Sequence, residues 1–480
     1  MAGELLGLGD LLNAAKPVGW TVKALTKVAT TGFTTIKKGE ETAEAKRKLA
    51  TAQKNAIASS SGNRSVYITS AFKRTAAFAL PCSAQETLLH VDSLSDDSCF
   101  RNISQKSSVN LLASGGNDNL RNSALTWFCC DAIANHKTVI VLHCKNHNLQ
   151  KQLTSSQLAS KYRPVDGRAY CYNPFSGKSS REVASLLFEA IPEKYKIPYT
   201  CKTLIEIIAE IKNQSGETLI LHPTGSGNNG IADCPVEGLI TVLDKRHKAG
   251  KINDTVYNRL LSDYVAIQND AKYLRAYFDD LKRQLASLPV NEGAKTLDFK
   301  KAVSAKRVIS IDVSNQANDL YLNIVTEHLR ELLRTNQNIA IVIDGISLHI
   351  DNKLIKMLQQ NQGVNFAISI KDAYASIGAK KDELNSLLGG DCRLVLSKHG
   401  SPRSAEYWSE YFGEYERTEI VESFTEGERR LLGPNELKQG WSPHKTKERK
   451  IDADVFKNMT ETQFCAYDAA SGNITLLELS

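Results

Sequence analysis

Short apolar runs alternate with helical patterns along most of the chain, from about Val66 onward. The runs are four to six residues long, rich in valine and isoleucine, and bounded by polar residues. Runs of this kind are typical of strands buried on both faces of a sheet. The expected strands are Val109–Ala113, Thr138–His143, Arg168–Tyr172, Thr218–His222, Arg307–Asp312, Ile339–Asp344, Asn365–Ile370 and Cys392–Leu396. Helical segments between them predict βαβ units and an α/β fold, with a mainly parallel sheet covered by helices on both faces.

A different rhythm runs from Leu260 to Leu288, where apolar residues recur at alternating spacings of four and three. They are Leu260, Tyr264, Ile267, Ala271, Leu274, Phe278, Leu281, Leu285 and Leu288. This heptad pattern predicts one long helix with a single apolar seam. With the pattern around Leu239–His247 it indicates an all-helical hairpin inserted into the α/β domain. A homodimeric coiled coil is the alternative.

Residues 1–58 form a separate amphipathic and then basic segment. Its apolar positions begin with Leu5 and Leu6, and a lysine- and arginine-rich helical pattern follows before the Ser/Gly/Asn cluster Ser59–Ser65. One interpretation is an arm that contacts a membrane surface or a partner. The other is a helix packed on its own domain. The predicted organisation is an N-terminal arm and linker (1–65), the first part of a core (66–239), a helical insertion (240–298) and the second part of the core (299–480).

Composition adds few constraints. The 480 residues are 42% hydrophobic and 24% charged, with a formal net charge of +7, which permits an acidic partner such as nucleic acid without requiring one. No apolar stretch is long enough to span a bilayer, and no signal peptide is expected. The ten cysteines form no CxxC pair and no zinc-site spacing, so we expect no metal site and a reducing, cytoplasmic compartment.

The loop after the first core strand has the strand–loop–helix context of a phosphate-binding loop. Aligned with GxxxxGK[ST], Gly115 supplies the first glycine and Gly116 follows it. Leu120 replaces the second glycine, Arg121 the lysine and Asn122 the hydroxyl that holds Mg²⁺. The nucleotide-binding candidates are Gly115, Gly116, Asn119, Arg121, Asn122 and Ser123. As an ATP site this loop is predicted to be disabled.

Two other glycine loops compete with the first. Gly177-Lys178-Ser179 carries the terminal triplet, but Tyr172 stands where the opening glycine belongs, which favours an ordinary turn. The loop Gly225–Gly230 matches GxGxxG, yet Pro235 interrupts the helix that should follow, which favours a plain loop.

A candidate acidic motif ends the run Ile339–Asp344. In folds with a phosphate-binding loop, this position places a carboxylate near Mg²⁺. Asp344 is therefore the candidate catalytic residue. The next position, which holds the glutamate that orients attacking water in such ATPases, is Gly345. A carboxylate that only caps a turn is the alternative.

The order of these segments resembles the TraG/TraD coupling-protein family of type IV secretion, in the FtsK/HerA clade of RecA-like P-loop ATPases. The resemblance covers about residues 105–480. It is carried by Val139–Lys145, Ala169–Pro174, the helical insertion 240–298, Leu387–Leu396, Ser404–Trp408 with Phe412-Gly413, and Phe464–Ile474, which is similar to a closing hairpin. The sequence departs from the family at Lys371, where the sensor-like strand often ends in glutamine, and in lacking the usual N-terminal membrane hairpin.

The resemblance implies a RecA-like core, ATP with Mg²⁺ as the cofactor of intact members, and assembly with like or related subunits. With the substituted loop, the first hypothesis is a degenerate, non-hydrolysing subunit that forms homo- or hetero-oligomers and binds a protein or nucleic acid, with Arg393, Lys398, Arg403 and Lys371 as a candidate basic surface. Scattered surface charges are the preferred interpretation of those four. The alternatives are a working ATPase with an unusual loop, and a structural protein at a membrane surface that acts through residues 1–58 and the heptad helix. Attachment to the membrane would then be peripheral, at the inner membrane.

Overall fold

The computed structural model describes residues 66–68, 110–221, 230–286, 288, 294–313, 320–335, 338–346, 353–360, 363–389, 392–426, 437–468 and 473–478. The predicted arm at 1–58 lies outside these residues. The described chain divides into two units. One contains the large sheet, its helices and a helical group, and the other contains a two-stranded ribbon.

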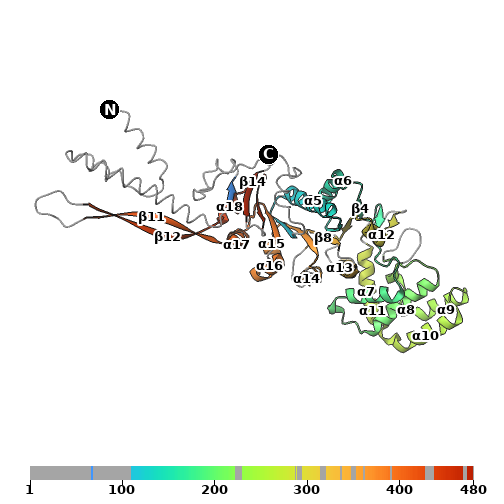
Figure 1. Ribbon diagram of the computed structural model, residues 1–480. Coiled ribbons are helices and arrows are strands. Elements are labelled where there is room, and N and C mark those ends of the chain that lie inside the picture. Colours follow the sequence, from blue (N-terminus) through green and yellow to red (C-terminus); the bar gives the residue numbers. More distant parts are fainter. Residues whose placement is uncertain are drawn as a thin grey trace, which may run out of the picture. The chain divides into compact units, whose positions relative to one another are not determined.

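The large sheet has ten strands in the order β1-β14-β13-β10-β2-β9-β8-β3-β7-β4. Its strands are β1 (Val66–Ile68), β2 (Asn110–Ser114), β3 (Thr138–His143), β4 (Tyr162–Val165), β7 (Val308–Asp312), β8 (Ile339–Asp344), β9 (Asn365–Ile370), β10 (Cys392–Leu396), β13 (Gln463–Asp468) and β14 (Asn473–Glu478). Every neighbouring pair is parallel except the two that involve β13. The predicted mainly parallel α/β fold is confirmed (Figure 1).

Helices cover both faces of this sheet. The described helices are α5 (Asp118–Ala134), α6 (His147–Ser155), α7 (Ser180–Ala190), α8 (Thr200–Gln214), α9 (Leu239–Lys248), α10 (Asp254–Ile267), α11 (Ala271–Leu285), α12 (Phe299–Ser304), α13 (Leu320–Thr335), α14 (Lys353–Gln360), α15 (Ala373–Ser376), α16 (Lys381–Leu388), α17 (Pro402–Phe412) and α18 (Ala453–Asn458). Of these, α8 to α11 pack with one another and on α7 and α13. Alternate strand residues divide between two cores. Val139 and Val141 pack with α5 and α6, whereas Ile140 and Leu142 belong to the larger core with α13 and α14.

Most predicted strands agree with the structure to within a residue or two, but two do not. The run Thr218–His222 forms no strand over its described residues, although Leu219 to Leu221 are buried. The run Arg168–Tyr172 contributes only β5 (Tyr170–Cys171), which pairs with β6 (Lys295–Thr296) in a small separate sheet. The strand at this edge of the large sheet is instead β4, which contains Pro164. A proline is tolerated at a sheet edge because one side of that strand needs no N–H donors.

The prediction of one long helix from Leu260 to Leu288 is wrong. Helix α10 ends at Ile267, the 3₁₀ turn η4 (Gln268–Asp270) follows, and α11 begins at Ala271. The start of α8 holds this break, because Thr200 Oγ1 donates to Asp270 Oδ2 at 2.5 Å and the Cys201 thiol contacts the Asp270 carbonyl.

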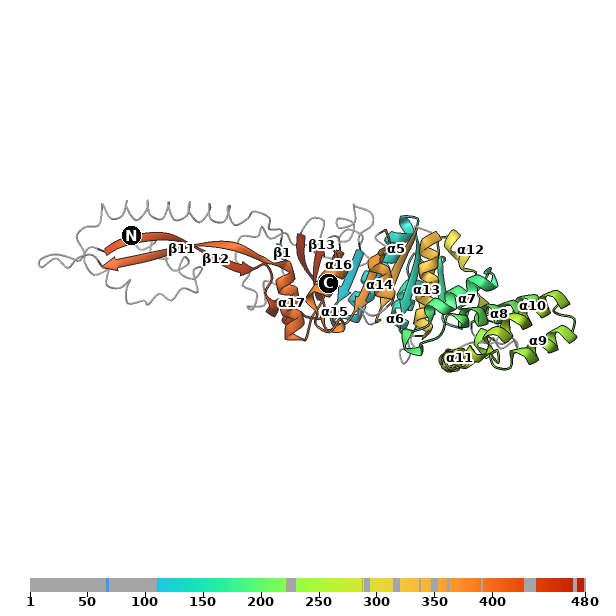
Figure 2. The same ribbon diagram turned by 90° about the horizontal axis from the view of Figure 1, so that it is seen from below.

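The predicted pairing of the two helical patterns is confirmed, since α9 packs against α10 (Figure 2). The apolar seam lies in the core of its own chain, which supports intrachain packing over a coiled coil. Helix α8 precedes residue 240 and packs on both α10 and α11. The limits 240–298 of the insertion as a folding unit stay a prediction.

The closing hairpin is present, because β13 and β14 pair antiparallel from Gln463↔Glu478 to Asp468↔Asn473. The second unit contributes a long ribbon, in which β11 (Glu414–Glu426) pairs with β12 (Leu437–Arg449). The apolar-run pattern gave no signal for this ribbon, because its strands are rich in charged residues.

Candidate functional site

The carboxyl ends of β7, β3, β8, β9, β2 and β10 lie along one edge of the sheet, which we call the carboxyl edge. Its strand ends are in register, with Asp312 beside His143, His143 beside Asp344, and Asp344 beside Ser369. Ligands of open α/β sheets bind outside the carboxyl ends of the strands. The first glycine loop and Asp344 therefore share the expected edge, separated by β9.

The first glycine loop is only three residues long. Strand β2 ends at Ser114 and α5 begins at Asp118, with Asn117 as its N-cap. Leu120, Arg121 and Asn122 therefore lie inside the helix. A phosphate loop needs a longer stretch of backbone to wrap its anion.

The two glycine N–H groups of this loop are bonded to protein. Gly115 N donates to the Lys371 carbonyl at 3.1 Å, and Gly116 N donates to the Lys398 carbonyl at 2.9 Å. Lys371 and Lys398 follow β9 and β10, the two strands that flank β2. Carbonyl oxygens of the neighbouring strands thus accept the donors that a phosphate would use.

The next donors are also taken. Asn117 N donates to Ser397 Oγ at 3.2 Å, and the Asn117 side chain accepts from Leu120 N at 3.0 Å as an ordinary N-cap. Leu120 itself is 1% exposed and belongs to the core beneath α5. The position that must be open for a phosphate is filled by a core side chain.

Arg121 folds back onto its own loop. Its guanidinium donates to the Gly115 carbonyl and to Asp118 Oδ1, the latter at 2.6 Å. Its charge is therefore neutralised locally. Asn119 is exposed on the first turn of α5, and Ser123 is half-buried one turn further along.

Asn122 and Asp344 are brought together through a third residue that sequence reasoning missed. Asn146, the N-cap of α6, donates from Nδ2 to Asn122 Oδ1 at 2.8 Å and to Asp344 Oδ2 at 2.6 Å. Asn122 is 2% exposed and Asp344 is 6% exposed. An amide has two N–H donors, so one side chain can serve both acceptors. A neutral amide thus joins the two positions that align with the Mg²⁺-holding residues of a phosphate-loop site.

Gly345 follows Asp344 in the left-handed region, with φ of +68°. Its N–H donates to the Ser369 carbonyl at 2.9 Å, and a Cβ added there would meet only Cys144 at 3.9 Å. The position has room for a side chain, but the backbone conformation favours glycine.

A second buried network holds the segment after β10 against the glycine loop. His399 Nδ1 lies 2.7 Å from the Ser397 carbonyl, so this nitrogen carries the proton. Nε2 then accepts from Ser114 Oγ at 3.0 Å and from Trp408 Nε1 at 3.1 Å. Burial lowers the pKa of His399, in keeping with a neutral ring. The sequence analysis touched this network only at Trp408, as part of the segment Ser404–Trp408.

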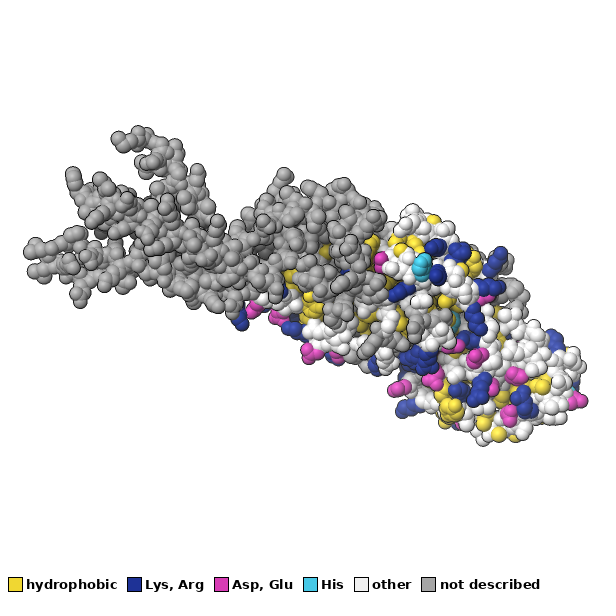
Figure 3. Space-filling view, viewed as in Figure 1, with side chains coloured by type: hydrophobic (Ala, Val, Ile, Leu, Met, Phe, Trp, Pro, Cys, Tyr) yellow, Lys and Arg dark blue, Asp and Glu magenta, His cyan; other side chains and the backbone are white. Residues whose placement is uncertain are grey.

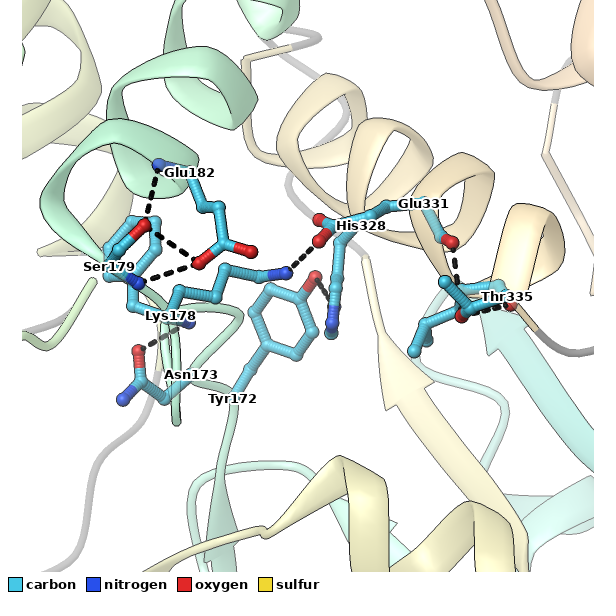
Figure 4. Close-up of polar contacts among 10 residues, drawn as sticks. Tyr172, Asn173, Lys178, Ser179, Glu182, His328, Glu331 and Thr335 are labelled. Carbon is cyan, nitrogen blue, oxygen red and sulfur yellow. Dashed lines mark hydrogen bonds and ion pairs between the residues drawn. The ribbon is translucent and has the colours of Figure 1, made fainter.

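The second glycine loop is a turn that caps a helix, as expected. Ser179 caps α7 and forms a reciprocal capping box with Glu182, and Lys178 forms an ion pair with Glu331 of α13 (Figure 4). Beside it, the Tyr172 hydroxyl lies 2.9 Å from His328 Nδ1. Burial lowers the pKa of His328 to about 3. The third loop, Gly225–Gly230, falls outside the described residues except for Gly230, whose N–H donates to Asp233.

The four candidate basic residues do not form one surface. Lys371, Lys398 and Arg403 are exposed at or near the carboxyl edge. Arg393 is 7% exposed near the opposite end of β10. Burial raises the pKa of Asp131 there, and the Arg393 charge opposes that rise in part. Figure 3 shows basic and acidic side chains interspersed on the visible described face. The interpretation as scattered charges is supported for Arg393.

Within the described ranges, no group of three or more His, Cys, Asp or Glu side chains is arranged to hold a metal ion. No described helix combines the length and apolarity needed to cross a membrane.

No protein-family model matches the chain, and no curated protein matches it. Solved structures do. The bacterial conjugative coupling protein TrwB, in an unbound monoclinic form, is 11% identical over 78% of this chain and 89% of that chain, with a TM-score of 0.48. TrwB in complex with ADP and Mg²⁺ is 12% identical over 77% and 84%, with a TM-score of 0.47. VirB4 of Thermoanaerobacter pseudethanolicus is 11% identical over 77% and 89%, with a TM-score of 0.36.

Proposed function

We propose that this chain is a catalytically degenerate RecA-like subunit, similar to type IV secretion coupling proteins, that does not hydrolyse ATP. It assembles with like or related subunits and binds a protein or nucleic-acid partner in translocation or secretion. The observation that carries the proposal is the closed glycine loop. Its Gly115 and Gly116 N–H groups already donate to strand-end carbonyls of the same chain.

ATP and Mg²⁺ fit this edge poorly. Opening the loop to a triphosphate would break the hydrogen bonds of Gly115, Gly116 and Asn117 and remove Leu120 from the core. Each of these hydrogen bonds contributes about 0.5–1.5 kcal/mol net to the closed arrangement. The Asn146 amide would also have to leave Asp344 before a metal could approach. We therefore derive no catalytic step through a nucleotide.

The order of the carboxyl-edge residues supports a RecA-like origin. The loop strand β2, the sensor-like strand β9 and the acidic strand β8 stand side by side, with the glycine loop and Asp344 at the same edge. Loss of the chemistry leaves the surfaces of the fold available for assembly, because subunit contacts depend on shape and not on hydrolysis. Membrane contact through residues 1–58 stays a prediction.

Calorimetric titration of the full chain with ATP and Mg²⁺, with and without single- and double-stranded DNA, tests the proposal. We expect no saturable binding up to about 1 mM nucleotide, which corresponds to about 4 kcal/mol of binding free energy. ATP turnover is measured on the same samples, with Asp344→Ala as the matched variant. Wild type and variant are expected to give the same background rate.

Saturable binding together with turnover that disappears in Asp344→Ala would overturn the proposal in favour of an ATPase with an unusual loop. Binding without turnover would refute the closed loop while leaving the loss of hydrolysis intact. Circular dichroism of Asp344→Ala shows whether a loss of turnover reflects chemistry or unfolding.

A further inference from the structure

Four basic side chains gather at the edge of the large sheet that lies opposite the carboxyl edge. Strands β4 and β7 are parallel neighbours, so their amino ends lie side by side. Lys161 and Arg163 stand on either side of Tyr162, the first residue of β4, and Lys306 and Arg307 immediately precede β7. We call Lys161, Arg163, Lys306 and Arg307 the amino-edge cluster.

The two arginines of the cluster converge on one backbone carbonyl. Arg163 Nη1 donates to the Ser160 carbonyl oxygen at 3.2 Å, and Arg307 Nη1 donates to the same oxygen at 3.1 Å. Arg163 Nη1 also donates to the Tyr162 carbonyl at 2.6 Å. Because a guanidinium has five N–H donors, most donors of both side chains have no acceptor in the described part of the chain.

No acid among the described residues forms an ion pair with any side chain of the cluster. By contrast, Lys301 on the preceding helix α12 pairs with Asp298 at 3.4 Å. Two guanidiniums held at one oxygen repel each other, and an anion between them would remove that repulsion and accept their remaining donors. Lys306 is exposed and the other three residues are half-buried, so an anion can reach them from solvent.

The chemistry of the cluster favours a chain of phosphate groups as its ligand. Arginine matches the geometry of a phosphate with its planar fork, and lysine adds a point charge. Adjacent strands are about 5 Å apart, so cations on two strand starts suit a polymer of phosphates better than a single one.

The surroundings of the cluster exclude two other binding modes. The exposed large apolar side chains among the described residues are Tyr199, Val265 and Tyr273, and all three lie in or beside helices α8, α10 and α11. The amino-edge cluster therefore has no exposed aromatic ring on which bases could stack and no apolar anchor for a lipid layer. Its contacts with a nucleic acid are limited to the backbone, which carries no sequence information.

We propose that the amino-edge cluster binds the phosphate backbone of double-stranded nucleic acid without reading its sequence. A duplex is favoured over a single strand because the surface supplies charge and no stacking platform. This assignment deepens the partner part of the proposed function and rests on it. The cluster and the closed glycine loop lie at opposite edges of the sheet, so this binding requires no nucleotide.

Fluorescence anisotropy of the full chain with labelled DNA duplexes of two unrelated sequences tests the assignment, without nucleotide and over a range of salt concentrations. The first variant combines Lys161→Gln with Lys306→Gln. It is expected to bind both duplexes about tenfold more weakly or worse, and to lower the slope of log affinity against log salt by about 2. A single strand of the same length should bind the wild type no more tightly than the duplex.

The second variant combines Arg163→Gln with Arg307→Gln, which removes the two guanidinium charges and keeps amide donors in their place. It should weaken binding in the same way. The matched control combines Lys371→Gln with Lys398→Gln, which makes the same charge change at exposed positions of the carboxyl edge. The control should keep the affinity and the salt slope of the wild type, and circular dichroism shows that each variant is folded.

Four outcomes would overturn the assignment. Affinity unchanged in both cluster variants, or reduced equally in the control, shows that the amino edge is not the binding surface. Tighter binding to the single strand than to the duplex refutes backbone-only recognition. Binding to phosphatidylserine vesicles without binding to nucleic acid assigns the cluster to a membrane, and a wild type that binds no nucleic acid leaves the protein-partner form of the proposed function standing. None of these results bears on the closed glycine loop, which nucleotide titration tests separately.

Discussion

The two glycine loops that the structure describes in full differ in which half of a phosphate site each retains. The loop at Gly115 has the strand–loop–helix context but not the residues, and the turn at Gly177 has the residues but not the context. Both loops are closed by other parts of the chain. The first is closed by backbone carbonyls after β9 and β10, and the second by Glu331 of α13.

This comparison shows that a lysine and a hydroxyl in sequence do not make an anion site. Lys178 and Ser179 have the right side chains, but one is used in an ion pair and the other in a helix cap. At Gly115 the edge of the sheet is the right place for a ligand, and the donors there are used internally. The position in the fold and the free donors must coincide.

Alanine substitution at Gly115 and at Gly177 should give the largest difference between the two loops in the free energy of unfolding. Gly115 has φ of +127°, and an added Cβ would lie 2.8 Å from the Ser397 backbone. Gly115→Ala is expected to cost roughly 2–4 kcal/mol through combined strain and overlap. Gly177 has φ of +71° with only Lys300 Nζ within 4 Å, so Gly177→Ala should cost about 1 kcal/mol.

Urea unfolding followed by tryptophan fluorescence measures both costs. Equal costs at the two positions would show that the segment after β10 is not packed tightly against the first loop. Gly378→Ala is the matched control, because Gly378 has a similar φ of +69° and nothing within 4 Å of its added Cβ.

The region around the Gly177 turn, which includes His328, should also make the stability of the chain depend on pH. His328 is 4% exposed, and burial lowers its pKa to about 3 from an ordinary value near 6.5. Between these values the unfolded chain binds the proton and the folded chain does not, so stability falls as pH decreases below about 6.5. The expected loss approaches about 1.4 kcal/mol per pH unit.

His328→Gln removes this titration and should reduce the slope of the stability profile between pH 6.5 and pH 5, while the buried His399 keeps its own contribution. Glutamine keeps a polar group facing the Tyr172 hydroxyl, which limits the direct cost of the change. His147→Gln, at an exposed position on α6, is the control for the replacement of a histidine by glutamine. An identical slope in wild type and His328→Gln would contradict the assignment of a neutral buried histidine.

The smallest expected effect concerns the ion pair of the second turn. The Lys178 side chain is 11% exposed and that of Glu331 is 37% exposed. Lys178→Met keeps the apolar stem and leaves Glu331 accessible to water, so we expect a loss of at most about 1 kcal/mol. Glu331→Gln should cost more, because it leaves the more buried lysine without its charge partner. The reverse order in thermal or urea unfolding would mean that solvent, not Glu331, neutralises Lys178.

The sequence predicted the central strands well. The runs Thr138–His143, Ile339–Asp344 and Asn365–Ile370 match β3, β8 and β9 residue for residue. Strands buried on both faces must be apolar along their whole length, so their limits are visible in the residue pattern. Strand β4 escaped notice because an edge strand containing Pro164 lacks that pattern.

The tertiary structure decided what local patterns could not. The heptad seam from Leu260 gives no reason for a helix to stop at Ile267, and the break is held by Thr200, which lies 70 residues before its partner Asp270. The closure of the Gly115 loop likewise depends on the backbone carbonyls of Lys371 and Lys398. These carbonyls reach the loop only because β9 and β10 flank β2. The sequence by itself determined which residues of the loop depart from a phosphate site. Which groups occupy its donors was decided by strand order, because hydrogen-bond partners distant in sequence meet only in the folded sheet.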